Sequence, residues 1–535
     1  GTKYAIGIYA KNQGTTTSAY TIKTPITTGE KGIGIFAADK SIIQYNRGTI
    51  DVGKNGIGIY VQKQISANTT IESKVSLGTA TDKPTINLAE GSVAAIVGEN
   101  AHFDGGNATI NLSGSGVGVY GLKGSVTNVG SWTFNNNGHS AEEIRTKEGR
   151  AAIENPVVDK DLKPGMVLSH VINGEAILNS GFLVNAAAGS KNIIGLMAEG
   201  NENETSTAPV AWRELGYEVV NNGTLDLSNA ISSTGIYLDS ARGKNSGPLK
   251  VGDKSTAIYG VYNSSTAPYS GAAAGYVNKS EILNEATGSI TIGNGSAGIY
   301  AIGFDKVENK GPLTGGNNSV GIYGKRVLNK GTITVGNDGT GIYSEGGNVD
   351  LDTTSQINVG TDKAVGVFTK GNGQIVTARS GSTMTIGDSS FGFLNEGTGN
   401  TINSNVVNVN LKDNSIYIYS KNAGTVNNVT NLTATGTVGN NYGIYSAGQV
   451  TNTGNINFTS GKGNVGIYSI DGGRAVNTAT ISVGASDTAN SIYSIGMAAG
   501  YVGDATTPAY TGNIVNEGTI NVTGKDSIGM YGVGS

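Results

Sequence analysis

One segment recurs along the chain with small changes. It reads NKGTITVGNDGTGIYSEGG at 329–347, YNRGTIDVGKNGIGIYVQK at 45–63 and VNEGTINVTGKDSIGMYGVG at 515–534. From Tyr300 to Tyr493 its apolar-Gly-apolar-aromatic part returns about every 20 to 26 residues. A period of this length indicates an array of stacked units rather than several domains, because each unit buries its apolar face only against its neighbours.

Each repeat contains two short segments with the alternation of a half-buried strand. In 332–335 (TITV), Ile333 and Val335 should point inward and both Thr outward. In 320–323 (VGIY), Val and Ile should face the core, with Gly and Tyr on the outer face. Runs such as GNDG and GKNG supply corners with positive φ. The sequence therefore predicts an all-β fold, a right-handed parallel β-helix (β-solenoid) of about 20 coils with loop and helical insertions.

Composition excludes several classes of site. Gly accounts for 84 of 535 residues, and 36 basic against 40 acidic residues give a formal charge of −4, which argues against a nucleic-acid partner. The absence of Cys excludes disulfides and Cys-based metal sites. The three His show no metal spacing, and no run of 18 apolar residues is present. We expect no cofactor, no metal and no catalytic residue.

Breaks in the repeat divide the chain. We expect β-helix coils with loop inserts over 1–120, an irregular inserted region over 121–235, and regular β-helix over 236–535 with loop inserts near 260–280 and 495–513. The charged stretch SAEEIRTKEGRAAIENP (140–156) begins with a Ser followed by two Glu, which predicts a short capped helix near 140–155.

Stacked NxGTIxVG and GIGIY repeats, many Gly, Asn and Thr residues, and no Cys resemble the passenger region of type V autotransporters. The GIGIYA and GIYS motifs are most similar to those of the very large fusobacterial outer-membrane adhesins. This group includes an arginine-inhibitable adhesin and a galactose-type sugar-binding adhesin. The resemblance implies extracellular display on a Gram-negative cell, adhesion to a host-cell receptor (protein or glycan) or to partner bacteria, and roles in biofilm and virulence. It also implies anchoring by a C-terminal membrane β-barrel absent from this stretch, and we expect an internal piece of a longer protein.

An acidic insert is one candidate binding site. It contains Glu199, Glu202, Glu204, Trp212 and Tyr217. Its carboxylates could hold a cationic ligand such as a guanidinium, with the indole stacked on it. The alternative is a charged loop that only keeps the surface soluble.

Two tyrosine-rich inserts form the second candidate. They contain Tyr262, Tyr269, Tyr276, Tyr501 and Tyr510. These rings could stack on sugars or on a protein receptor, or they could cover the side of the β-helix. The repeated GIY tyrosines, in contrast, should form a ladder whose stacking stabilises successive coils.

The sequence favours a surface adhesin segment that binds over a large area without chemistry. One alternative is a shaft that binds nothing, which should be uniform along its length. The other is a carbohydrate-active β-helix enzyme, which requires convergent carboxylates in a groove. Carboxylates are sparse along the coils, and no GxSxG or phosphate-loop motif is present, so we expect no enzyme.

Overall fold

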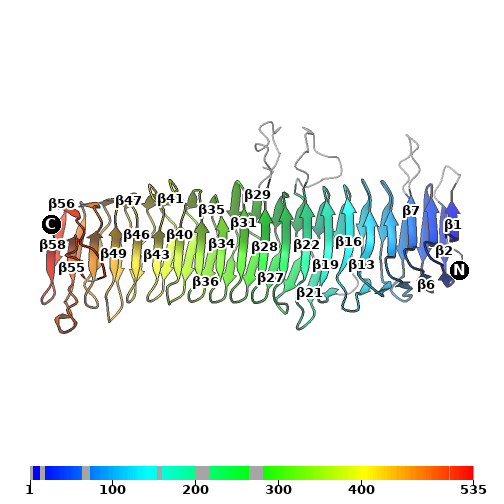
Figure 1. The fold of residues 1–535 in the computed structure, drawn as a ribbon, viewed down its shortest axis with the longest axis horizontal. Helices are drawn as coiled ribbons and strands as arrows, with labels where there is room; N and C mark the ends of the chain where they lie inside the picture. The colour runs from blue at the N-terminus through cyan, green and yellow to red at the C-terminus, as the bar shows by residue number, and fades with distance from the viewer. Residues whose placement is uncertain are drawn as a thin grey trace, which may run out of the picture. The chain divides into compact units, whose positions relative to one another are not determined.

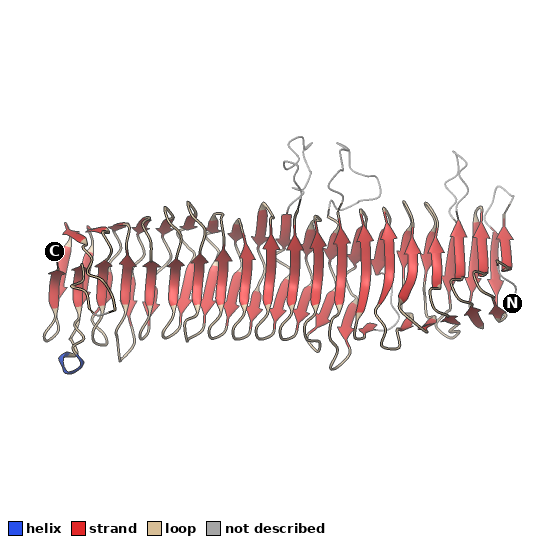
Figure 2. Cartoon of the chain, viewed as in Figure 1, coloured by secondary structure: helices blue, strands red, loops and turns tan. Residues whose placement is uncertain are grey.

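The computed structural model describes residues 4–12, 18–62, 73–153, 160–200, 217–263, 281–504 and 506–533. The chain divides into two compact units. Unit 1 comprises Gly1–Glu281 with Thr287–Ser289, and unit 2 comprises Ile282–Ala286 with Ile290–Ser535. Each unit consists of coils of three short strands, drawn as arrows in Figures 1 and 2.

The first strand of each coil belongs to sheet A, and in most coils it carries the GIY motif or a close variant. The described residues contain 20 such strands, half of them in each unit. In unit 1 they are β1 (Ile6–Lys11), β4 (Ile33–Ala38), β7 (Ile57–Gln62), β10 (Val93–Val97), β13 (Gly116–Gly121), β16 (Ala141–Lys147), β19 (Met166–Ile172), β22 (Ile194–Glu199), β25 (Thr234–Asp239) and β28 (Thr256–Val261). In unit 2 they are β31 (Ala297–Ile302), β34 (Val320–Gly324), β37 (Thr340–Ser344), β40 (Val365–Thr369), β43 (Phe391–Asn395), β46 (Ile416–Ser420), β49 (Tyr442–Ser446), β52 (Val465–Ser469), β55 (Ile495–Ala499) and β58 (Ile528–Gly532).

The second strand of each coil belongs to sheet B. In unit 1 these strands are β2 (Ser18–Ile22), β5 (Ser41–Tyr45), β8 (Lys74–Leu77), β11 (His102–Asp104), β14 (Val126–Asn128), β17 (Arg150–Ile153), β20 (Glu175–Leu178), β23 (Val219–Asn221) and β26 (Gly243–Asn245). In unit 2 they are β32 (Lys306–Asn309), β35 (Val327–Asn329), β38 (Val349–Leu351), β41 (Ile375–Ala378), β44 (Thr401–Ser404), β47 (Thr425–Asn428), β50 (Gln449–Asn452), β53 (Arg474–Asn477) and β56 (Asn513–Asn516).

The third strand of each coil carries the Thr-Ile motif and forms the third face, which is interrupted in both units. In unit 1 one third-face sheet contains β3 (Ile26–Thr27), β6 (Thr49–Val52), β9 (Thr85–Leu88), β12 (Thr109–Leu112) and β15 (Thr133–Asn135), and the next contains β18 (Lys160–Leu162), β21 (Leu183–Ala186), β24 (Thr224–Leu227) and β27 (Pro248–Val251). In unit 2 one contains β33 (Leu313–Gly315), β36 (Thr332–Val335), β39 (Gln356–Val359) and β42 (Thr383–Ile386), and the next β45 (Val409–Leu411), β48 (Leu432–Ala434), β51 (Ile456–Phe458), β54 (Thr480–Val483) and β57 (Thr519–Val522). Strands β29 (Glu281–Asn284) and β30 (Ser289–Ile292) contain residues of both units.

Within each unit, the strands pair in parallel with the equivalent strands of neighbouring coils, except where the third face is interrupted between β15 and β18 and between β42 and β45. For example, β34 pairs with β37 with Tyr323 opposite Tyr343, and β36 pairs with β39 with Ile333 opposite Ile357. The predicted parallel β-helix of about 20 coils is therefore confirmed. The predicted positive-φ corners are also present, and Asp338 in GNDG has φ +53°.

The predicted alternation is right for the third face and wrong for part of sheet A. Ile333 and Val335 are buried between half-exposed threonines, as predicted. In 320–323, however, Val320 is half-exposed while both Gly321 and Ile322 are buried. The strand therefore turns two successive residues inward. A Cβ on Gly321 would lie 2.5 Å from the carbonyl oxygen of Gly341 in the next coil, so this inner position requires close backbone approach.

The Asn of the NxGTI motif forms a buried ladder. Asn428 donates to the side-chain oxygen of Asn452 at 2.8 Å, and Asn452 donates to that of Asn477 at 2.7 Å. The second N–H of Asn452 donates to the carbonyl oxygen of Gly454 at 2.8 Å. Each amide thus uses both donors, one toward the next coil and one within its own turn, which explains why the motif requires Asn.

The helix predicted near 140–155 is wrong. Ala141–Lys147 forms β16 and Arg150–Ile153 forms β17. Ala141 pairs opposite Gly116 and Arg145 opposite Tyr120, so the charged stretch is one more coil. In the part of the chain that the structure describes, the one helix is a three-residue 3-10 turn, η1 (Thr488–Asn490), shown in blue in Figure 2. None of the described helical residues forms a segment with the length and apolarity needed to span a bilayer.

Candidate binding surface

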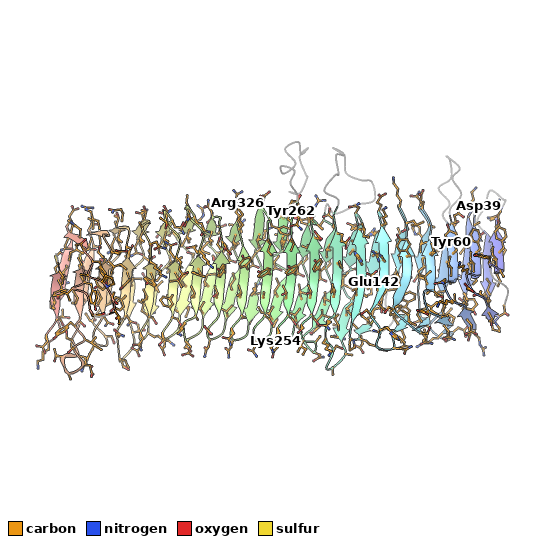
Figure 3. The ribbon with its side chains drawn as sticks, viewed as in Figure 1. Asp39, Tyr60, Glu142, Lys254, Tyr262 and Arg326 are labelled. Carbon is orange, nitrogen blue, oxygen red and sulfur yellow. The ribbon has the colours of Figure 1, made fainter. Side chains whose placement is uncertain are left out.

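Four of the five longest intervals between successive described strands lie at one corner of the coil, and the fifth, 484–494, lies between β54 and β55 at another corner. We call the connection from a sheet A strand to the following sheet B strand the A-to-B corner. The intervals 63–73, 200–218, 262–280 and 500–512 all lie there. In unit 1, Figure 3 labels Asp39 and Tyr262 at this edge of sheet A, with Lys254 at the opposite edge. These four intervals therefore all begin at the same end of their sheet A strands.

The outer face of sheet A carries a column of half-buried aromatic side chains next to this corner. In unit 2 the ring centroids of Tyr300 and Tyr323 lie 4.4 Å apart and those of Tyr323 and Tyr343 lie 5.1 Å apart, and both pairs are stacked. Phe368 continues the column edge-on at 4.7 Å from Tyr343. The predicted ladder is present, and its contacts stabilise neighbouring coils.

In unit 1 charged side chains interrupt the column. Register places Arg145 opposite Tyr120, His170 opposite Arg145, and Met197 opposite His170, before Tyr237 resumes the aromatic column. The imidazole of His170, only 4% exposed, lies between two carboxylates. Its Nδ1 lies 3.0 Å from Oε1 of Glu142, and its Nε2 lies 3.0 Å from Oε1 of Glu199. This interruption is a polar patch within an aromatic surface; Figure 3 labels Glu142 on it.

The predicted acidic site is only partly described. Glu199 ends β22 and faces His170, whereas Glu202, Glu204 and Trp212 lie outside the described residues. Tyr217 is buried, with 6% of its surface exposed. This ring is therefore part of the packing beneath the corner.

At the end of this interval, the carboxylate of Glu218 binds a guanidinium of the chain itself, that of Arg242. Arg242 donates from Nη2 to Oε1 of Glu218 at 2.7 Å and from Nε to Oε2 at 2.9 Å. Both side chains are buried, so this forked pair ties two sheet B coils together.

The tyrosine inserts are described in part. Tyr262 follows β28 and is half-buried, while Tyr269 and Tyr276 lie outside the described residues. Tyr501 and Tyr510 form a two-residue bridge, with ring centroids 5.4 Å apart. The Tyr501 hydroxyl donates to Asp504, and this bond holds the pKa of the Asp504 carboxyl well below its usual range.

This bridge covers a gap in the aromatic column of unit 2. Ala498 occupies the column position between Tyr468 and Tyr531. The Tyr510 hydroxyl lies 3.4 Å from that of Tyr468, which also donates to the carbonyl oxygen of Gly500 at 2.9 Å. Tyr510 therefore adds a ring from the insert to the surface at this point.

Sequence reasoning missed a buried ion pair in unit 1. Glu143 takes the inner position of sheet A that is glycine in β13, and Lys160 takes the inner position of the third face that is Val184 in β21. The Lys160 ammonium lies 2.7 Å from Oε2 of Glu143, and both residues are buried. Burial raises the pKa of Glu143 and lowers that of Lys160, with the opposite charge of each opposing these shifts.

One signal could have revealed this pair. Tyr120, Arg145 and His170 follow one another at the coil spacing, which places AEEIR directly over GVGVY. Ranges described by the structure contain no group of three or more His, Cys, Asp or Glu side chains arranged to hold a metal ion.

Residues 323–535 match the family model described as BigA third pectate lyase-like domain. This description agrees with the parallel β-helix of unit 2. The match suggests an adhesin-like passenger β-helix of a bacterial surface protein; the words pectate lyase-like describe a fold and leave catalysis open. No curated protein matches the chain, and no solved structure matches it.

Proposed function

We propose that the chain is a passenger segment of a cell-surface adhesin that attaches a Gram-negative bacterium to a host-cell receptor or to partner bacteria. The match of residues 323–535 to a BigA domain supports surface display and an adhesin-like role. The GIGIYA motif supports the finer proposal that the protein is a fusobacterial outer-membrane adhesin with roles in virulence and biofilm formation.

The gathering of long intervals at the A-to-B corner carries this proposal. A shaft needs no insertions, and insertions without a function should be spread over all three corners. Here four of the five longest intervals, 63–73, 200–218, 262–280 and 500–512, share one corner beside the aromatic column, and 484–494 is the exception. Segments presented on one side of a rigid scaffold form the usual arrangement for large-area recognition.

We also propose that binding involves no chemistry. The carboxylates at this surface already contact the chain's own side chains, with Glu142 and Glu199 on His170 and Glu218 on Arg242. A hydrolytic pair would require two carboxylates facing a free groove. Partners are therefore a protein or glycan receptor rather than a turned-over substrate.

The test is binding of the purified chain to host cells and to partner bacteria. A corner variant replaces 63–72, 201–216 and 264–280 with short Gly-Ser linkers. A control variant shortens 485–493, which lies between β54 and β55 at a different corner. We expect saturable binding by the parent and the control, and at least about tenfold weaker binding by the corner variant, since interface anchors contribute about 1–2 kcal/mol or more each.

Competitors then separate the ligand classes. Inhibition by free arginine would assign binding to Glu199 and the acidic interval 200–218 that follows it, and inhibition by galactose-type sugars would assign it to the tyrosine intervals. Saturable binding that neither competitor blocks would indicate a protein receptor. Absence of saturable binding, or equal loss in the corner and control variants, would contradict the proposal and leave a shaft.

A further inference from the structure

A hollow opens on unit 2 at the corner between sheet B and the third face. Its volume is about 510 Å³, which falls within the roughly 300–1,000 Å³ of small-molecule sites. Sheet B strands β41, β44 and β47 form its floor, and Figure 1 labels β41 and β47. The turns after β41 and β44 form its rim and lead to β42 and β45, between which the third face is interrupted. The hollow is therefore separate from the A-to-B corner.

The floor of this hollow is fixed from the inside of the coil. Ser404 is buried, and its hydroxyl bonds with the hydroxyl of Tyr417 at 2.6 Å and with that of Thr430 at 2.8 Å. Tyr417 is itself fully buried. These contacts satisfy the polar groups beneath the floor, so the groups that remain for a ligand are those on its outer side.

The accessible lining consists mainly of neutral polar side chains. Thr377, Asn403 and Asn427 are half-exposed on the outer face of sheet B, and Ser380 and Asn405 are exposed in the turns. The Asn427 amide donates to the side-chain oxygen of Asn403 at 2.8 Å, which fixes the orientation of both amides. This bond uses one of the two N–H donors of Asn427 and one lone pair of the Asn403 oxygen. Both amides therefore keep donors and acceptors for a ligand.

The charge of the lining disfavours ionic ligands. Arg379 is the one charged residue among the described residues that line the hollow. Its guanidinium already forms a fork with Asp350, from Nε to Oδ1 at 2.9 Å and from Nη2 to Oδ2 at 2.5 Å. The pair is neutral as a whole, so an anion would have to compete with Asp350 for the guanidinium. Since these lining residues include no carboxylate, a cation gains no counter-charge there either.

Val429 supplies the apolar part of the surface. Its side chain lies at the rim and is 51% exposed. Hydroxyl and amide side chains act as donors and as acceptors, so they match a ligand whose own groups do both, as hydroxyls do. A sugar unit combines several hydroxyls with a small C–H face, for which Val429 is the matching contact.

We propose that this hollow binds a neutral sugar unit. The sugar hydroxyls pair with Thr377, Asn403 and Asn427, and the C–H face packs on Val429. A peptide is the competing neutral ligand, but it would need room for apolar side chains, and Val429 is the one exposed apolar residue in the described lining. The site goes beyond the function proposed above, which places binding at the A-to-B corner, and does not rest on it.

Saturation-transfer NMR of the purified chain with a series of soluble sugars tests the ligand class. The series contains glucose, galactose and mannose, the uronic acid and the amino sugar of each, and N-methylacetamide as a peptide analogue. We expect saturable transfer to at least one neutral hexose, weaker affinity for its charged counterparts, and no saturable transfer to N-methylacetamide. Tighter binding of a uronic acid or of an amino sugar, saturable binding of N-methylacetamide, or no saturable transfer to any neutral hexose would overturn the proposal.

Matched variants test the location. Ser380→Trp adds a large side chain at an exposed turn of the hollow and should abolish saturable transfer. Asn403→Ala should weaken binding roughly threefold to tenfold, as expected for the loss of one hydrogen bond. Asn457→Ala removes an exposed amide from the outer face of β51, outside the lining, and should leave affinity unchanged within about twofold. Thermal unfolding of all three variants checks that the fold is intact.

The variants also decide against the proposal if the site lies elsewhere. Unchanged binding by both Ser380→Trp and Asn403→Ala, or an equal loss in Asn457→Ala, would overturn it. Because soluble sugars are measured directly, this result is independent of whether the chain attaches to cells. Ser380→Trp also separates the hollow from the tyrosine intervals when sugars compete in the cell-binding assay.

Discussion

At the scale of single residues, the inner glycine of sheet A determines how closely coils can stack. A Cβ on Gly321 would lie 2.5 Å from the Gly341 carbonyl oxygen and 2.7 Å from the Ile333 side chain. The same close approach recurs at Gly341 and Gly466, where the Cβ would lie 2.6 and 2.5 Å from the next carbonyl. The glycine of the GIY motif is thus a packing requirement and not a turn signal.

Gly321→Ala should therefore destabilise unit 2 by about 1–3 kcal/mol, because overpacking forces a backbone shift. Gly529→Ala is the matched control, since it has the same motif position but a Cβ there meets nothing closer than 3.5 Å. Urea unfolding followed by circular dichroism gives both values. Equal stability of the two variants would show that the backbone yields at little cost.

At the scale of strands, large or charged inner side chains coincide with the interruptions of the third face. Glu143 and Lys160 lie at the interruption between β15 and β18. Tyr417 fills the inner glycine position of β46 near the interruption between β42 and β45, and its hydroxyl bonds with Ser404 at 2.6 Å. A side chain of this size needs room that stacked TIxV strands do not leave.

Breaking the buried pair should be costly. Lys160→Met leaves Glu143 buried without its counter-charge, and we expect a loss of about 3–5 kcal/mol in the free energy of unfolding. The double change Glu143→Gly with Lys160→Val restores the residue types found in β13 and β21 and should recover most of that loss. Denaturant titrations of the two variants measure both effects. If the double variant is as unstable as Lys160→Met, the pair does not act as a unit.

The pH dependence of Lys160→Met provides a second check. Burial raises the pKa of Glu143, and removal of the lysine takes away the opposing contribution. The folded state then binds more protons than the unfolded state, so stability of this variant rises as pH falls. Its deficit relative to the parent should shrink as pH falls towards the ordinary Glu pKa of roughly 4.3.

These strands also show how far the sequence could lead. Repeat spacing was sufficient to predict the coils, the Thr-Ile face and the corners, because one backbone pattern recurs. It failed at 140–155, where Glu143 occupies a position that the motif reserves for glycine and hides the period. Ion pairs between coils, such as Glu218 with Arg242, depend on which residues the register places side by side. The composition of a single segment does not show which residue of the next coil lies opposite each of its own.

At the scale of the whole chain, the raised pKa values of buried tyrosines make the folding stability decrease at alkaline pH. Burial raises the pKa of Tyr45 and of Tyr417 to about 12. Burial also raises the pKa of the column residues Tyr323, Tyr343 and Tyr468 above the ordinary value. Because the unfolded chain loses these protons near pH 10 and the folded chain retains them, folding stability decreases as pH rises above about 10.

We expect the urea concentration at the midpoint of unfolding to decrease as pH rises from about 10, the ordinary tyrosine pKa, towards about 12, the folded pKa of Tyr45 and Tyr417. Tyrosinate absorbance should appear together with unfolding rather than before it. Tyr417→Phe should be less stable near neutral pH by about 1 kcal/mol, since hydrogen bonds to Ser404 and Thr430 are lost. It should also show a smaller alkaline decrease. A midpoint independent of pH would contradict this account.

Strand register does not depend on the length of the segment at the A-to-B corner. β4 reaches β5 through two residues, whereas β7 reaches β8 only after 63–73, yet β4 pairs with β7 and β5 with β8 in unbroken register. The pairing of the coils is therefore structurally independent of the length of the corner segment. A lineage can replace what it presents to its surroundings by insertion, deletion or exchange at this corner while the same GIY and NxGTI coils are inherited unchanged.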